Sequence, residues 1–148
     1  LTHEDMTRFI MTLDESVDLI INAINNGKSG DLWVPKLKSM KIKDLAEIYA
    51  ELSCKKVELI PLRPGEKLNE SLICLAESPR AVEQENNYIL KPAHEKVEGE
   101  LKFFEYKSSD EVITKKELFD YLNQLGHLKL DLTVHKGSQI EEIRTSKY

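Results

Sequence analysis

The chain has 148 residues, of which 41% are hydrophobic and 32% are charged. This length is enough to bury the core of one domain, and the composition is that of an ordinary soluble globular protein. The net charge of −5 argues against general binding to nucleic acid or to a membrane surface. No apolar stretch reaches the length of a membrane-spanning helix, and the first residues do not have the pattern of a signal peptide.

Cysteine usage points to a reducing compartment. The chain has two cysteines, Cys54 and Cys74, whose spacing fits no zinc motif and which do not make a disulfide framework. We expect both to be buried free thiols, which fits a cytoplasmic protein. The sequence begins at Leu1 and enters a periodic apolar pattern almost at once, so it reads like part of a longer protein.

The first predicted helix starts at a T-x-x-E sequence, Thr12 to Glu15. In such a sequence the threonine and glutamate side chains each satisfy an unpaired amide of the first helical turn. Gly27 is the expected end of the helix, as a residue that tolerates a left-handed conformation. Asp31–Pro35 is then a short apolar run, which predicts a strand. The apolar residues that follow the T-x-x-E sequence recur at helical spacing: Leu13, Val17, Ile20, Ile21 and Ile24.

A second helix and a second strand follow in the same order. The helix is predicted to run to about Leu52, and the strand to cover Val57–Pro61. Helices alternating with short strands indicate an α/β arrangement. The apolar face of this second helix is formed by Ile42, Leu45, Ile48, Tyr49 and Leu52.

The next part of the chain has weaker signals. Asn69–Glu77 reads as a helix or an irregular segment, which Ser78-Pro79 interrupts. Tyr88–Leu90 predicts a short strand, His94–Glu100 a charged linker and Leu101–Tyr106 an extended segment.

A second T-x-x-E sequence, Thr114 to Glu117, predicts a helix that continues to Leu125 and stops at Gly126. Residues 127–148 read as a loosely held tail with one short strand at Leu128–Val134. We therefore expect three parts: an α/β subdomain at 1–93, an extension at 94–126 that ends in a helix, and the tail.

The stretch with the most specific chemistry is Leu62–Glu70, LRPGEKLNE. Pro64 fixes φ near −65°, and Gly65 can take the positive φ that a type II turn requires. Such a turn would present Arg63 and Glu66 together. An arginine held in this way can give a planar pair of donors to a diphosphate, and a carboxylate can accept from the two hydroxyls of a ribose. The alternative is a solvated turn with a weak Arg–Glu pair.

Other catalytic patterns are missing from the sequence. The four histidines are dispersed and have no metal-ligand spacing, and there is no G-x-S-x-G motif. The glycines do not form a dinucleotide-binding fingerprint. None of the five tyrosines is followed by lysine four positions later.

Several of these motifs together resemble a known family. They are the M-T-R-F sequence at Met6–Phe9, the T-x-x-E helix, the G-D-L-W-V strand, the I-K-D-L-A helix and R-P-G-E-K-L-N-E. In this order they resemble the C-terminal half of the UDP-N-acetylglucosamine 4,6-dehydratases and epimerases of capsule and flagellin glycan biosynthesis, which are extended short-chain dehydrogenase/reductases. The likeness runs from about Asp5 to Ala93 and continues through F-x-Y-x-S, with Phe104, Tyr106 and Ser108, and the Thr114–Leu125 helix.

The resemblance implies an α/β substrate-binding subdomain without its Rossmann half. In the family that N-terminal half binds NAD(P) and carries the Tyr-x-x-x-Lys pair, whereas the C-terminal half chiefly binds UDP. It implies that Arg63 holds the diphosphate, that Glu66 holds the uridine ribose and that Arg8 makes a second phosphate or ribose contact. Lys67 would add supporting charge, and Thr7 and Asn69 would support the site from behind. No catalytic residue, metal ligand or NAD(P) site is expected in this chain.

Two functions remain open from sequence. One is the UDP-sugar-binding portion of a nucleotide-sugar dehydratase or epimerase, which works with an N-terminal Rossmann half or a full-length relative. The other is a non-catalytic assembly module that docks on itself or on such a relative. Separated from the Rossmann half, the chain is expected to expose an apolar patch and to form homo-oligomers.

Overall fold

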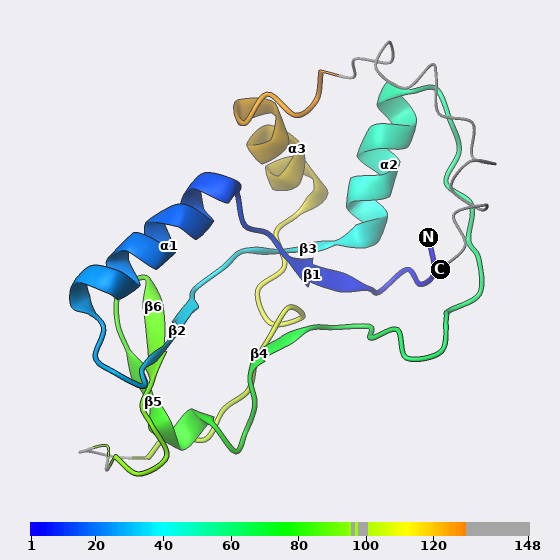
Figure 1. The fold of residues 1–148 in the computed structure, drawn as a ribbon. Helices are drawn as coiled ribbons and strands as arrows, with labels where there is room; N and C mark the ends of the chain where they lie inside the picture. The colour runs from blue at the N-terminus through cyan, green and yellow to red at the C-terminus, as the bar shows by residue number, and fades with distance from the viewer. Residues whose placement is uncertain (96, 98–100, 130–148) are drawn as a thin grey trace, which may run out of the picture.

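The computed structural model describes residues 1–95, 97 and 101–129. This part of the chain contains helices and short strands that alternate along the sequence (Figure 1). The helices are α1 (Leu13–Asn26), α2 (Ile42–Leu52) and α3 (Lys115–Gln124), with a short 3-10 helix η1 (Ser78–Arg80). The strands are β1 (Thr7–Phe9), β2 (Leu32–Pro35), β3 (Ser39–Lys41), β4 (Ser71–Ile73), β5 (Ala81–Glu83), β6 (Asn87–Leu90) and β7 (Tyr106–Lys107).

The strands that the structure describes form three small sheets, each of them antiparallel. The first pairs β1 with β3, the second has the order β2-β6-β5, and the third pairs β4 with β7. In the second sheet Ile89 lies opposite Trp33 on one side and Val82 on the other. The β4–β7 pair joins residues that are far apart in sequence, with Ser71 opposite Lys107.

Two hydrophobic clusters hold these pieces together. The first centres on Val34, Ile73 and Leu90 and includes the rings of Tyr88, Phe104 and Tyr106. The second centres on Ile48 of α2 and on Leu118 and Leu122 of α3. Residue 93 is the expected end of the first of the three parts. Each cluster takes side chains from both sides of it, since residues 104–122 pack directly on residues from the first part of the chain.

The T-x-x-E predictions are confirmed at both helices. In α1 the Thr12 hydroxyl accepts from the Glu15 amide at 3.1 Å, and the Glu15 carboxylate accepts from the Thr12 amide at 2.7 Å. The hydrogen bond from the Thr12 amide is the main cause that lowers the pKa of Glu15, and the Thr12 hydroxyl adds to the effect. In α3 Thr114 and Glu117 make the same pair of bonds.

The predicted helix ends are confirmed in position, with one difference in conformation. Gly126 follows α3 with a left-handed φ of +75°. Gly27 ends α1, but its φ is −74°, so it is extended and does not use the left-handed region.

Several predicted elements are wrong. Val57–Pro61 is not part of a sheet, and among the described residues its backbone pairs with Leu1: the Leu1 amino group donates to the Glu58 carbonyl and the Ile60 amide to the Leu1 carbonyl. Asn69–Glu77 contains β4, where a helix or an irregular segment was expected. Cys54 and Cys74 are exposed thiols, not buried ones.

Other expectations lie partly beyond the described residues. Most of the strand expected at Leu128–Val134 and the tail from 130 onward fall outside them. The beginning of that tail is placed, since the Tyr49 hydroxyl donates to the His127 carbonyl and Leu128 packs on the second cluster. Among the described residues, no helix is both long enough and apolar enough to cross a lipid bilayer.

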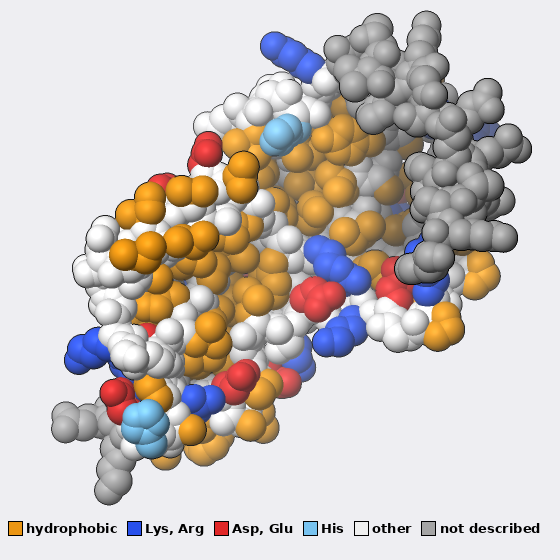
Figure 2. Space-filling view, in the orientation of Figure 1, with side chains coloured by type: hydrophobic (Ala, Val, Ile, Leu, Met, Phe, Trp, Pro, Cys, Tyr) orange, Lys and Arg blue, Asp and Glu red, His pale blue; other side chains and the backbone are white. Residues whose placement is uncertain are grey.

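The apolar face of α1 is exposed within the described part of the chain. Leu13 is 79% exposed, Ile20 56% and Ile24 75%, and no residue of the helix is buried. In Figure 2, hydrophobic side chains gather over α1 and continue across the middle of the molecule. The helix rests on the rest of the fold through its less exposed residues Ser16, Leu19 and Ala23. The exposed apolar patch expected from the sequence is therefore present.

One ion pair fixes the start of the second sheet. Lys91, directly after β6, donates to both carboxylate oxygens of Asp31 at 2.9 and 3.0 Å, and the Asp31 side chain is only 3% exposed. The Lys91 contact lowers the pKa of Asp31, and the Lys28 amide adds to the effect. Because the folded pKa is depressed, the stabilisation is present at neutral pH and is lost as the pH falls through the folded pKa.

Asp31→Asn tests this pair. We expect a lower free energy of unfolding at pH 7, measured by urea denaturation, because asparagine keeps the shape but removes the charge that pairs with Lys91. The difference from the wild type should shrink at an acidic pH below the folded pKa of Asp31, which is lower than the usual aspartate value, because the wild-type carboxylate is then protonated. Asp18→Asn on exposed α1 is the control, with the same change of charge. An equal loss of stability at both pH values would contradict the role of the ion pair.

Candidate functional site

The Arg63–Glu66 segment forms the predicted type II turn. The Glu66 amide donates to the Arg63 carbonyl at 3.1 Å, and Gly65 has a φ of +81°. The Glu66 carboxylate closes the turn, because its Oε2 accepts from the Arg63 amide at 3.2 Å. Gly65 is required here, since a side chain at this φ would be strained.

The Arg63 side chain projects from this turn into solvent. Arg63 is exposed, and no ion pair joins its guanidinium to another residue that the structure describes. Glu66 is partly buried, and its Oε1 accepts from the Thr2 hydroxyl at 3.1 Å. The turn thus offers a guanidinium on a fixed backbone, next to a carboxylate with acceptor capacity left over.

The turn is flanked by two segments, which we call its first leg (residues 57–62) and its second leg (residues 67–70). Both legs lie along the N-terminal residues of the chain. Before the turn, the Ile60 amide donates to the Leu1 carbonyl at 2.8 Å. After it, the Thr7 amide donates to the Leu68 carbonyl at 2.9 Å. Since residues 53–70 otherwise run along the edge of the molecule without helix or strand (green in Figure 1), these contacts give the turn its position.

The Arg8 guanidinium binds the second leg by donating to backbone carbonyls. Its Nη1 donates to the Thr7 and Leu68 carbonyls at 2.7 and 3.1 Å, and its Nη2 donates to the Lys67 carbonyl at 2.9 Å. Its Nε lies 3.6 Å from Glu70 Oε1. Of the five guanidinium N–H groups, this arrangement leaves one on Nη2 for a further acceptor.

A buried polar cluster lies behind the same leg. The Thr7 hydroxyl donates to Asn69 Oδ1 at 2.9 Å and lies 2.8 Å from the Ser108 hydroxyl. The Ser108 hydroxyl also accepts from the Glu70 amide at 2.9 Å. Thr7 is 4% exposed and Ser108 is fully buried, so these two hydroxyls are shielded from water, whereas Asn69 is exposed.

The structure therefore divides the predicted site residues into two groups. Arg63 and Glu66 are joined within the turn, and Thr7, Arg8 and Asn69 meet around its second leg. Lys67 contributes its carbonyl to Arg8, while its side chain is exposed. No contact joins Arg8 to Arg63 among the described residues, so the roles of these residues towards a ligand stay predictions.

Two residues of this site were not predicted. Thr2 holds Glu66, and Ser108 connects Thr7 with Glu70. Ser108 had a signal in the sequence, because it belongs to the F-x-Y-x-S motif, but that motif says nothing of its partner. Thr2 had no signal, since its contact spans 64 positions of the chain.

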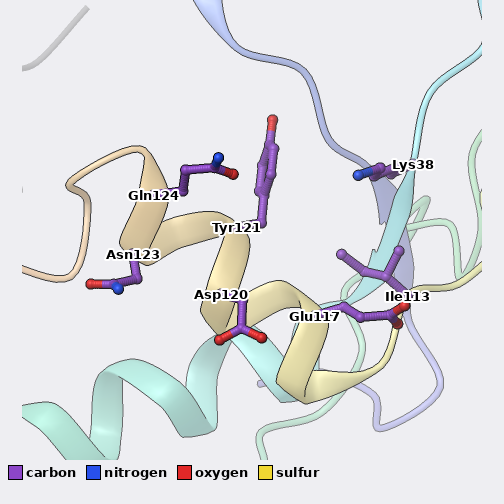
Figure 3. Close-up of a pocket in the computed structure, with 7 residues that line it drawn as sticks. All are labelled: Lys38, Ile113, Glu117, Asp120, Tyr121, Asn123 and Gln124. Atoms are coloured by element: carbon purple, nitrogen blue, oxygen red, sulfur yellow. The ribbon is translucent and has the colours of Figure 1, made fainter.

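A hollow lies along α3, away from the Arg63–Glu66 turn. It has a volume of about 600 Å³, and Figure 3 shows Tyr121 projecting from the helix on the side where Lys38 lies. The Lys38 ammonium is 5.6 Å from the centre of the Tyr121 ring. Glu117 is committed to the helix start, and its bonds with Thr114 lower its pKa, so it is poorly suited to hold a proton for catalysis. The other lining residues are Ile113, Asp120, Asn123 and Gln124.

A second hollow, of about 420 Å³, is lined in part by aromatic rings. The Tyr106 hydroxyl accepts from the Leu37 amide at 2.6 Å and donates to the Leu37 carbonyl at 3.1 Å. Burial raises the pKa of Tyr106, which keeps the hydroxyl protonated. This tyrosine links two parts of the backbone and is not poised as a base.

Two kinds of arrangement, a metal-ligand cluster and a glycine-rich strand-to-helix turn, are not found among the described residues. These residues contain no cluster of three or more histidine, cysteine, aspartate or glutamate side chains that could hold a metal ion. A dinucleotide-binding turn needs a parallel strand followed by a glycine-rich loop and a helix. Here the three sheets are antiparallel, and β3 runs into α2 directly through Lys41 and Ile42 without a glycine.

Comparison with known proteins assigns the chain to a family. The family model described as "Polysaccharide biosynthesis protein" matches residues 1–92, which is more than half of the chain. The chain belongs to this family. The match covers α1, both T-R-F and R-P-G-E-K motifs and the turn, and it ends before Ser108.

Relatives in this family include named sugar-nucleotide enzymes. A UDP-N-acetylglucosamine 4,6-dehydratase (inverting) of Campylobacter jejuni is 31% identical over 140 residues, covering 83% of this chain and 41% of that protein. A UDP-glucose 4-epimerase of Rickettsia felis is 41% identical over 83 residues, covering 55% of this chain and 24% of that protein. A protein of Methanocaldococcus jannaschii named "Uncharacterized membrane protein MJ1061" is 39% identical over 101 residues, covering 62% of this chain and 30% of that protein.

A solved structure confirms the fold class. The X-ray structure of Pen from Bacillus thuringiensis matches with a TM-score of 0.73 at 31% identity, covering 84% of this chain and 39% of that one. The chain thus has the α/β fold of the C-terminal part of an extended short-chain dehydrogenase/reductase. It spans less than half the length of these polysaccharide biosynthesis relatives.

Arg8→Lys tests the role of the guanidinium in holding the turn. A lysine keeps the charge but cannot reach three carbonyls with a planar group, so we expect the free energy of unfolding to fall by about 1–2 kcal/mol. The measurement is urea denaturation followed by circular dichroism. Arg80→Lys is the control, because the Arg80 guanidinium bonds a single carbonyl, that of Lys91. A loss for Arg8→Lys no larger than for Arg80→Lys would mean that the carbonyl contacts add nothing.

Proposed function

We propose that this chain is the UDP-sugar-binding portion of a nucleotide-sugar 4,6-dehydratase or epimerase of polysaccharide or glycan biosynthesis, and that it is not catalytically complete by itself. The observation that carries the proposal is the type II turn that fixes Arg63 in an exposed position beside Glu66. The names of the dehydratase and epimerase relatives support it.

The proposed contacts follow from the geometry of the turn. Arg63 offers two parallel N–H groups to the diphosphate, and its backbone is already fixed, so less entropy is lost on binding. Glu66 uses one acceptor position on each oxygen for Thr2 and Arg63, which leaves positions for the two ribose hydroxyls.

The other site residues play smaller parts in this proposal. Arg8 contributes its charge and the remaining N–H of Nη2 to a phosphate, and Lys67 adds positive charge nearby. Thr7 and Asn69 support the turn from behind through their mutual hydrogen bond.

The reaction itself needs a second protein part. We place NAD(P) in an N-terminal Rossmann half or in a full-length relative, because the sequence contains neither the glycine-rich dinucleotide fingerprint nor a Tyr-x-x-x-Lys pair. The complex would act in the cytoplasm, which fits two free cysteines.

A second candidate function is favoured by the exposed apolar face of α1. A helix with Leu13, Ile20 and Ile24 more than half exposed is typical of an interaction surface. In this reading the chain is a non-catalytic assembly module that docks on itself or on a full-length relative, and the turn has no ligand.

Arg63→Ala tests the binding proposal by calorimetric titration with UDP and UDP-N-acetylglucosamine. We expect the wild type to bind both saturably, and the variant to lose about 2 kcal/mol or more, which is roughly a thirtyfold rise in Kd. Lys116→Ala on exposed α3 is the control, since it removes the same charge away from the turn. An unchanged Kd in Arg63→Ala would exclude the diphosphate contact.

Ile24→Glu tests the assembly module by sedimentation velocity. We expect the wild type to self-associate, and the glutamate to weaken association because it places a charge on the apolar face of α1. Asn25→Glu is the matched control, because it adds the same charge at the neighbouring position on the same helix. A monomeric wild type, or an equal effect of both variants, would contradict association through this face.

A further inference from the structure

We propose that Ser108, which does not belong to the turn and makes no contact with Arg63, is a positioning residue that holds the proposed UDP-binding turn in place. The inference rests on the proposed function for its consequence in ligand binding. Its structural part, that Ser108 fixes residues 67–70, stands on the hydrogen bonds around the Ser108 hydroxyl.

The hydroxyl of Ser108 has a defined set of partners. It accepts from the Glu70 amide at 2.9 Å, it lies 2.8 Å from the Thr7 hydroxyl, and it donates to the Thr7 carbonyl at 3.1 Å. The Ser108 amide donates to the Glu70 carbonyl at 2.9 Å. Glu70 is therefore held by Ser108 through both its amide and its carbonyl.

These bonds close a ring around the second leg of the turn. Each hydroxyl has one proton to donate, so the donors and acceptors follow one another in one order around the ring. The Glu70 amide donates to the Ser108 hydroxyl, the single proton of that hydroxyl is shared between the Thr7 hydroxyl and the Thr7 carbonyl, and the Thr7 hydroxyl donates to Asn69 Oδ1. Because Asn69 precedes Glu70 directly, the ring starts and ends on the same short segment and fixes it at two adjacent residues.

Burial makes this ring sensitive to the loss of one member. Ser108 is fully buried and Thr7 is 4% exposed, so water does not readily replace a missing hydroxyl. Without the Ser108 hydroxyl, the Glu70 amide and the Thr7 carbonyl each lose a hydrogen-bond partner. The leg would then move to regain hydrogen bonds, and the turn at Arg63 and Glu66 would move with it.

The fold offers a matched buried serine away from the turn. Ser78 is 1% exposed, donates to the Leu75 carbonyl at 2.9 Å and accepts from the Phe104 amide at 3.1 Å. It thus has the burial and the hydrogen-bonding pattern of Ser108 but lies in η1, next to the first hydrophobic cluster.

The experiment compares Ser108→Ala with Ser78→Ala in the same chain. Amide hydrogen exchange is measured residue by residue, and UDP affinity by calorimetry. In Ser108→Ala we expect the protection of the Glu70 and Thr7 amides to fall by about tenfold or more, and the Kd for UDP to rise by about tenfold. In Ser78→Ala we expect a similar fall in stability, unchanged relative protection of Glu70 and Thr7, and a Kd within about twofold of the wild type.

The outcomes separate this inference from the proposed function. A wild type that does not bind UDP overturns the proposed function, and the hydrogen exchange alone then decides whether Ser108 fixes the turn. Unchanged protection of Glu70 in Ser108→Ala, or equal Kd changes in the two serine variants, overturns the positioning role. If Ser108→Ala does not fold, Thr7→Val is used instead, since it opens the same ring without changing the size of the side chain, and the same two readouts apply.

Discussion

The contact between the hydroxyls of Thr7 and Ser108 joins two points 101 positions apart in the chain. Around it, β1 meets the second leg of the Arg63–Glu66 turn, and the end of β7 meets the residue before β4. A buried hydroxyl is costly unless it is bonded, so this contact helps to fix the mutual position of the three segments. It acts beside the packing of Tyr106 on Phe9 and Ile73, which joins β7 to β1 and β4.

Features of the chain that depend on neighbours in sequence could be predicted. The two T-x-x-E helix starts and the Pro64-Gly65 turn follow from local backbone chemistry, and the structure confirms them. The strand at Val57–Pro61 could not be judged in this way, because a strand exists only where a partner strand lies beside it. The contacts of Arg8 were equally hidden, since a sequence shows that a guanidinium is present but not which carbonyls it meets.

The fold is consistent with a part of a larger unit. Its two clusters are small, the apolar face of α1 is exposed within the part of the chain that the structure describes, and the relatives are more than twice as long. The amphipathic pattern of α1 predicted a helix correctly but carried no information about what covers its apolar face. The matched proteins contain chain beyond the part that aligns here.

The way in which Arg8 holds the turn has an evolutionary consequence. It bonds the carbonyls of residues 67 and 68, a group that every amino acid carries, and makes no demand on their side chains. Both side chains are exposed. Substitutions at these two positions can therefore accumulate without loosening the loop, so that related proteins can vary the surface beside the turn while the backbone that carries the turn stays the same.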